Sequence, residues 1–175
     1  MNKQLLIRNC MLATFFNDGY NATKILEHVD ILIENGKILC IDHGIEAPEA
    51  QVIDATGKLA VPSFVNGWHR AVASLVSKSI AADVKCTRFG DTPLYFRVNP
   101  FVNIAQEVLT DAQLKDLLRL SLYQTIESGT TSVLESCSVR ELPLYLELCE
   151  ELGMRTVACP ALMSRKRLPE MDAWG

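Results

Sequence analysis

Apolar and polar residues alternate through the first third of the chain, which indicates β-strands with one face turned to solvent. The clearest case is residues 28–34, where every second residue is apolar. Asn35 and Gly36 follow, and this pair predicts a type I′ hairpin turn because both residues tolerate positive φ. Residues 1–58 are therefore predicted to form a β-rich module. Further strands are predicted at residues 5–12, 37–41 and 51–54.

The pattern then changes from alternation to short apolar runs. Residues 59–61 form one such run, and residues 64–66 are predicted to be a short buried strand. The strand leads to Trp68, His69 and Arg70. In parallel α/β folds the chemistry lies at the carboxyl ends of the strands, so a site is expected first at these three residues.

From residue 71 onward, helical and strand patterns follow one another. After a short helix predicted at residues 71–80, Thr110 and Gln113 form a capping box that begins a longer helix with a stripe of leucines. Gly129 ends that helix, and residues 130–136 are predicted to be a buried strand.

The same succession then repeats. Ser138 and Glu141 offer a second capping box, and Pro143 places the start of the regular helix near itself. Gly153 ends the apolar stripe of this helix, and residues 154–162 predict a third buried strand. Alternating helices and strands are the pattern of a parallel sheet, so the fold class is predicted to be α/β.

Charge and cysteine content exclude several classes of function. The net charge is −4 with dispersed lysines and arginines, which argues against a nucleic-acid or anionic membrane partner. No apolar run approaches the roughly 20 residues of a membrane span, and a signal-peptide core is missing from the start. The six cysteines are dispersed, as expected of reduced thiols in a cytoplasmic protein.

The segment from Asp54 to Asn66 and the turn at Gly129, Thr130 and Thr131 resemble the amidohydrolase superfamily, in its cytosine-deaminase-like and chlorohydrolase-like branch. The resemblance implies a β-sandwich-like module at residues 1–58. It implies a partial β/α barrel at residues 59–175, because a complete barrel takes about 250 residues and this segment supplies three strands.

The resemblance also implies a site that this chain departs from. In the family the strand at residues 64–66 leads to a His-x-His pair that binds the catalytic metal, zinc or iron in intact members. Here Trp68 and Arg70 occupy the two ligand positions, and neither side chain binds a cation. We therefore expect no metal and no cofactor on this chain. The implied lid over the active-site mouth falls in residues 81–103, an irregular stretch whose aromatics could equally well cover exposed core.

The remaining candidates for chemistry are His69 and Glu135, near Cys137 and Cys159 if the three strands lie side by side. Glu135 could serve as an acid or base, but a carboxylate paired with Arg70 or Arg155 is the favoured reading. His28 and His43 are expected to be surface or turn histidines. The catalytic residues thus stay undetermined.

Two functions are consistent with the sequence. The first is a metal-dependent hydrolase of the amidohydrolase type, acting on C–N or C–Cl bonds of cyclic substrates, with this chain inactive on its own. The second is a noncatalytic interaction or oligomerisation module derived from that fold. In either case an uncovered face of the β module predicts a homo-oligomer or a partner chain, and a small-molecule substrate is expected only if the family activity is retained.

Overall fold

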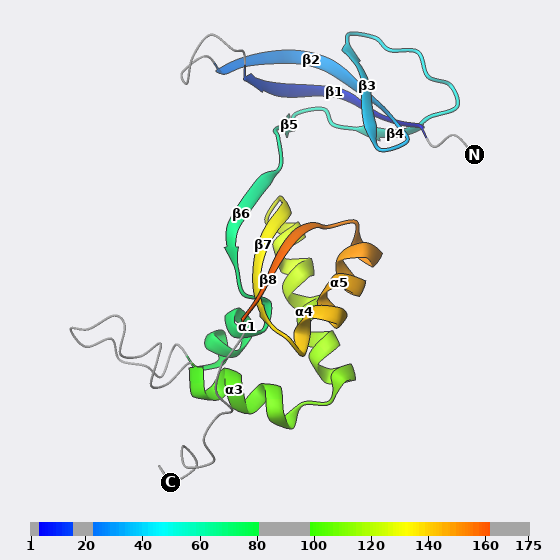
Figure 1. The fold of residues 1–175 in the computed structure, drawn as a ribbon. Helices are drawn as coiled ribbons and strands as arrows, with labels where there is room; N and C mark the ends of the chain where they lie inside the picture. Colours follow the sequence, from blue (N-terminus) through cyan, green and yellow to red (C-terminus); the bar gives the residue numbers. More distant parts are fainter. Residues whose placement is uncertain (1–3, 16–22, 81–98, 162–175) are drawn as a thin grey trace, which may run out of the picture. The chain divides into compact units, whose positions relative to one another are not determined.

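The computed structural model describes residues 4–15, 23–80 and 99–161 of the chain. The chain divides into a first unit, Met1–Pro62, and a second unit, Ser63–Gly175 (Figure 1). Within the described residues, no helix is long and apolar enough to cross a membrane.

The first unit is a five-stranded sheet in which four strands follow the order β3-β2-β1-β4 and β5 pairs with β1. Neighbours β1, β2 and β3 are antiparallel, while β4 and β5 run parallel to β1. At the turn between β2 and β3, Asn35 has φ 50° and Gly36 has φ 75°, which confirms the predicted type I′ hairpin. The strands are β1 (Gln4–Phe15), β2 (Thr23–Glu34), β3 (Lys37–Asp42), β4 (Gln51–Asp54) and β5 (Leu59–Ala60).

A buried carboxylate holds an irregularity in this sheet. The β1–β2 pairing shifts register after Ile7, and Asn9 there has φ 58°. Asp30 is 4% exposed and accepts hydrogen bonds from the backbone N–H groups of Asn9 at 2.8 Å and Ile45 at 3.0 Å. Both carboxylate oxygens of Asp30 thus accept backbone hydrogen bonds. The core beside it contains Cys10, Val29, Ile31 and Ala55.

Several apolar side chains of the first unit are exposed. Ile38 is 63% exposed and Leu39 is 59% exposed, both on β3. Val52 and Ile53 on β4 are also exposed.

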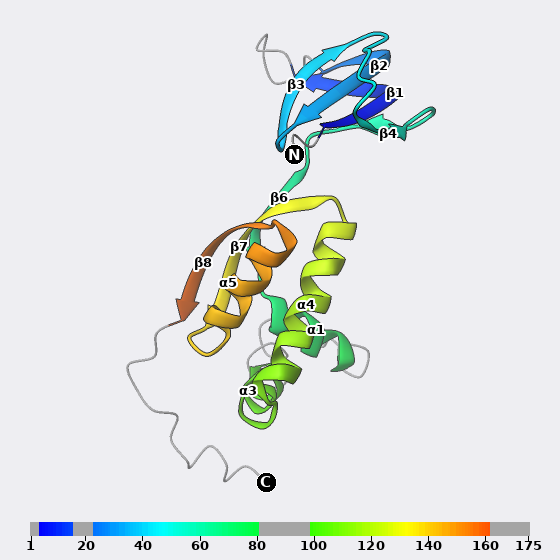
Figure 2. The same ribbon diagram turned by 90° about the vertical axis from the view of Figure 1, so that its right-hand side faces the viewer.

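The second unit has three parallel strands in the order β6-β7-β8, with helices packed along one side (Figures 1 and 2). Leucines of α4 and Tyr145 and Leu148 of α5 form the core against Val133 of β7. The elements are β6 (Phe64–His69), α1 (Ala71–Ile80), α3 (Asn99–Val108), α4 (Asp111–Glu127), β7 (Thr130–Ser138), α5 (Glu141–Leu152) and β8 (Arg155–Ala161).

The capping box predicted at Thr110 and Gln113 begins α4, and reciprocal hydrogen bonds between Ser138 and Glu141 precede α5. The Thr110 hydroxyl accepts from Gln113 N, and the Gln113 side chain accepts from Thr110 N at 3.0 Å. Before α5, Ser138 Oγ accepts from Glu141 N at 3.1 Å, and Glu141 Oε2 accepts from Ser138 N at 3.0 Å. The helix starts at Glu141, two residues before Pro143, which falls in the first turn where its missing N–H costs no hydrogen bond.

Two sequence expectations about this unit are wrong. Residues 99–103 were predicted to be irregular, but they begin α3, with Pro100 as the second helical residue. A proline in the first turn favours a helix start, so it is not a breaker there. Residues 81–98, the rest of the predicted lid, lie outside the described residues.

The second wrong expectation concerns the strands that were predicted to be buried. Residues of β6 are largely exposed, as are alternate residues of β8. Each strand has one side against the helices and one side without a covering layer in the described part of the chain. We call the latter the open side and define it by Trp68, Leu134, Val157 and Cys159, which are all exposed.

Candidate functional site

His69 and Glu135 meet at the carboxyl ends of β6 and β7. They are partners in the parallel register, and both face the helices, where His69 is 6% exposed and Glu135 fully buried. His69 Nδ1 and Glu135 Oε2 form a hydrogen-bonded pair. Glu135 Oε1 also accepts from Ala71 N at 2.9 Å, the first residue of α1. One carboxylate therefore orients the imidazole and holds the start of the next helix.

The other ring nitrogen of His69 is also occupied. His69 Nε2 lies 3.0 Å from Thr125 Oγ1 on α4, and that hydroxyl donates to the Ser121 carbonyl at 2.8 Å. With one nitrogen on Glu135 and the other on Thr125, the ring offers no free lone pair to a ligand. The arrangement ties β6, β7, α1 and α4 together and is a structural network.

The expected partner of Glu135 is therefore wrong. The sequence favoured Arg70 or Arg155, but the register places His69 opposite Glu135 and Ser132 opposite Arg155. Residues two apart share a side of a strand, so Glu135 and the buried Val133 both face the helices. The pairing was missed because sequence spacing does not reveal the register between strands 66 residues apart.

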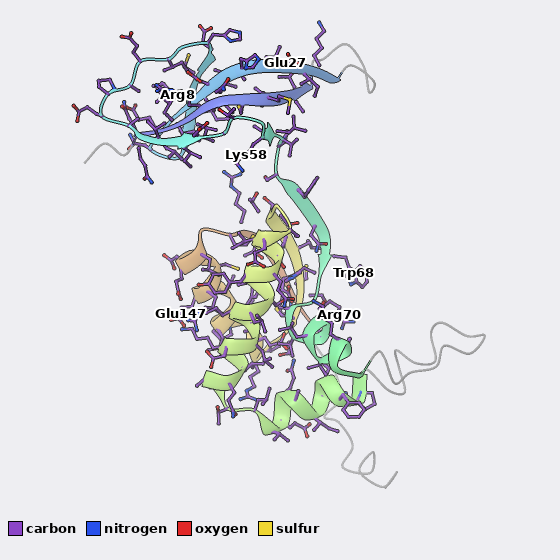
Figure 3. The ribbon with its side chains drawn as sticks, turned by 180° about the vertical axis from the view of Figure 1, so that it is seen from behind. Arg8, Glu27, Lys58, Trp68, Arg70 and Glu147 are labelled. Atoms are coloured by element: carbon purple, nitrogen blue, oxygen red, sulfur yellow. The ribbon has the colours of Figure 1, made fainter. Side chains whose placement is uncertain are left out.

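Trp68 and Arg70 occupy different environments from His69. Trp68 is 75% exposed on the open side, and Figure 3 shows its ring pointing away from the helices. Arg70 follows the end of β6 and is half-buried, and its Nε atom is buried without a hydrogen-bond partner. Among the residues that the structure describes, no group of three or more His, Cys, Asp and Glu side chains could hold a metal ion. Neither the indole of Trp68 nor the guanidinium of Arg70 is a metal ligand.

Glu141 is a buried carboxyl at the same end of the sheet that the sequence marked only as a helix cap. It is 3% exposed, and its two oxygens contact Ser138 N and Gln106 Nε2. Burial raises the pKa of Glu141 to about 7, opposed by the hydrogen bond from Ser138. The negative charge of Glu135 contributes to this rise, whereas the positive charge of Arg70 opposes it. Its position shortly after the strand predicted at residues 130–136 was the available signal.

The cysteines do not form a nucleophilic pair with His69. Cys137 is buried, and desolvation together with the charges of Glu135 and Glu141 raises the pKa of its thiol to about 11. Cys159 is exposed on the open side, away from the buried imidazole. The thiol of Cys137, with so high a pKa, is a poor nucleophile at neutral pH. Cys86 lies outside the described residues.

His28 and His43 belong to the first unit, and both are exposed, as predicted. His28 Nδ1 is 2.9 Å from Asn9 Oδ1, and His43 Nδ1 is 2.9 Å from the His28 carbonyl oxygen. These contacts stabilise the loop beside Asp30.

Comparison with known proteins places this geometry in context. No family model matches the chain. Over 168 residues it is 29% identical to 5-methylthioadenosine/S-adenosylhomocysteine deaminase of Caldicellulosiruptor saccharolyticus, covering 93% of this chain and 35% of that protein.

Solved structures show the same fold. E. coli guanine deaminase matches with a TM-score of 0.73 and 20% identity, covering 95% of this chain and 38% of the other. Atrazine chlorohydrolase from Arthrobacter aurescens TC1, complexed with zinc, matches with a TM-score of 0.67 and 18% identity, covering 93% and 36%.

The chain thus spans little more than a third of the length of each of these proteins. The match to the deaminase and the fold shared with both solved enzymes agree with the residues that carried the resemblance in the sequence. These comparisons support the resemblance of this chain to the amidohydrolase superfamily.

Proposed function

We propose that this chain is a noncatalytic module of the amidohydrolase fold, made of a β-sandwich-like unit and a three-strand part of the β/α barrel. One observation supports this most directly. The positions expected to bind a metal are Trp68 and Arg70, and the neighbouring His69 faces the helices with both ring nitrogens hydrogen-bonded. A catalytic zinc needs three protein ligands and an open position for water.

The module acts, in this proposal, by association with a second copy or with a partner chain. Exposed apolar residues on β3 and β4 and on the open side of the second unit support it. Monomers rarely expose contiguous apolar patches beyond a few hundred Å². Nucleic acid is a poor candidate for the partner because the net charge is −4. The free thiols of Cys10, Cys137 and Cys149 support a cytoplasmic location.

A second candidate function is metal-dependent hydrolysis of C–N or C–Cl bonds in cyclic substrates. The deaminase and chlorohydrolase relatives favour it. In that case the metal ligands and most of the cavity come from further βα units outside the residues described here. The open side is the surface on which such units would pack.

Metal analysis and designed ligand pairs separate the two functions. We expect the purified chain to contain no stoichiometric zinc, iron or manganese. A double variant with Trp68→His and Arg70→His recreates the family pair on β6, and a control with Val157→His and Cys159→His places the same spacing on β8. Both are expected to bind zinc weakly and alike, with no ammonia or chloride released from aminated and chlorinated heterocycles. One tightly held metal per native chain, or multiple turnovers by the first variant alone, would overturn the proposal.

Light scattering tests the association. Trp68→Asp places a charge on the open side and is expected to lower the average mass, whereas Leu120→Asp, at an exposed apolar residue of α4, is the matched control. A native chain that stays monomeric at all concentrations counts against the proposed association.

A further inference from the structure

An unpaired cation lies at the end of β6. The Nε atom of Arg70 is buried and has no hydrogen-bond partner, the one such side-chain nitrogen or oxygen found among the described residues. None of the ion pairs formed by these residues includes Arg70. A guanidinium carries five N–H donors, and leaving one of them buried without a partner is costly. This side chain lacks a partner within the described part of the fold.

Two buried carboxylates lie nearby, but their hydrogen bonds go elsewhere. Glu135 bonds to His69 and to Ala71 N. Glu141 bonds to Ser138 N and the Gln106 side chain, while the charge of Arg70 is close enough to lower the pKa of Glu141. Burial still raises that pKa to about 7, so Glu141 is partly neutral at neutral pH and compensates the guanidinium incompletely.

The position of Arg70 is where α/β folds bind ligands. It follows β6 directly and precedes α1, whose N-terminal end carries partial positive charge. Trp68 and Arg70 lie at the same end of β6 (Figure 3), and the indole is 75% exposed. A cation at the same strand end as an exposed aromatic ring is suited to a small molecule with an anionic group and an apolar part.

We propose that Arg70 binds an oxyanion, either a carboxylate or a phosphate group, of a small molecule whose apolar part lies against Trp68. The guanidinium takes the place of the cation that the resemblance assigns to this end of the strand. A planar fork of N–H donors matches two oxygens of a carboxylate or phosphate, which a lysine ammonium does not reproduce. This inference does not depend on whether the chain associates with a partner.

Calorimetric titration of the native chain with benzoate and, separately, with inorganic phosphate tests the site and distinguishes the two anions. We expect saturable binding of at least one probe with a dissociation constant of about 1 mM. Arg70→Met is expected to weaken it at least about tenfold, and Arg70→Lys by less, because lysine keeps the charge and loses the fork. Arg155→Met is the matched control, since Arg155 is exposed at the opposite, amino end of β8 and its loss removes the same charge.

Circular dichroism checks that the variants fold. If Arg70→Met does not fold, the native chain supplies the answer through phenylglyoxal modification mapped by mass spectrometry, in which the bound probe should slow modification of Arg70 and leave that of Arg155 unchanged. The proposal is overturned if neither probe saturates the native chain. Equal weakening by Arg70→Met and Arg155→Met, or equal protection of both arginines, would overturn it as well.

Discussion

The two sides of the β6-β7-β8 sheet differ in what their side chains do. On the helix side, Glu135 and His69 are buried and fully hydrogen-bonded. On the open side, Leu134 and Val157 are partners in register and both exposed. Glu135 and Leu134, which are neighbours on β7, therefore belong to the buried core and to the open side, respectively. The difference teaches that the polar candidates His69 and Glu135 are bonded within the helix side, whereas the open side exposes apolar side chains.

Removing the buried carboxylate of Glu135 should give the largest difference in free energy of unfolding between the two sides. Glu135→Ala leaves His69 and Ala71 N unpaired inside the unit, and breaking such a buried pair costs about 3–5 kcal/mol in free energy of unfolding. Leu134→Ala, one residue away on the open side, should cost under about 1 kcal/mol. Urea unfolding followed by tryptophan fluorescence measures both, since both tryptophans belong to the second unit. Equal losses would show that the open side is covered in solution.

Truncating an apolar residue on each side gives the next largest effect. Leu118 is fully buried in the core between α4 and the sheet, so Leu118→Ala should cost about 3 kcal/mol through the cavity it leaves. Val157 is 62% exposed, and Val157→Ala should change the free energy of unfolding by no more than about 0.5 kcal/mol. The same unfolding experiment applies. A large loss at Val157 would indicate that another chain packs there.

The buried carboxyl of Glu141 predicts a pH dependence of smaller size. Burial raises its pKa from 4.5 to about 7 in the folded state, so between these values the folded chain holds a proton that the unfolded chain releases. The stability contributed by protonated Glu141 is fully present below about pH 4.5 and is lost as pH rises through 7. The free energy of unfolding then decreases by an amount on the order of 2 kcal/mol. Unfolding measured from pH 5 to pH 8 checks this.

Glu141→Gln should remove that dependence, because a neutral amide keeps the oxygen that accepts from Ser138 N. Glu147→Gln, at an exposed carboxylate of the same helix, is the control and should leave the slope unchanged. A native chain whose stability rises over this pH range would contradict the predicted direction.

The smallest expected effect concerns the second contact of His69. Thr125→Val removes the hydroxyl that lies between His69 Nε2 and the Ser121 carbonyl, at a cost of about 1 kcal/mol. The control Thr131→Val removes an exposed hydroxyl bonded to Ser63 and should cost less than about 0.5 kcal/mol. Thermal unfolding of the two variants in parallel gives the comparison. A larger loss at Thr131 would mean that the contact of the Thr125 hydroxyl with His69 adds no stability.

Much of the fold was predictable because its signals are local. The turn at Asn35 and Gly36 depends on positive φ at adjacent residues, and the box at Thr110 and Gln113 depends on groups three residues apart. The start of α3 lies in a stretch predicted to be irregular, and only the observed helix shows Pro100 in the favourable first turn.

The candidate site divides in the same way. By itself the sequence determined that Trp68 and Arg70 lie two residues apart after a predicted strand, where the resemblance implies the ligand pair, because residue order alone fixes this. Tertiary structure alone decided that His69 pairs with Glu135, because the register between β6 and β7 arises from packing between distant segments. It also decided which side of the strands is buried, since side chains alternate along any strand and the helices that pack on one side select the core.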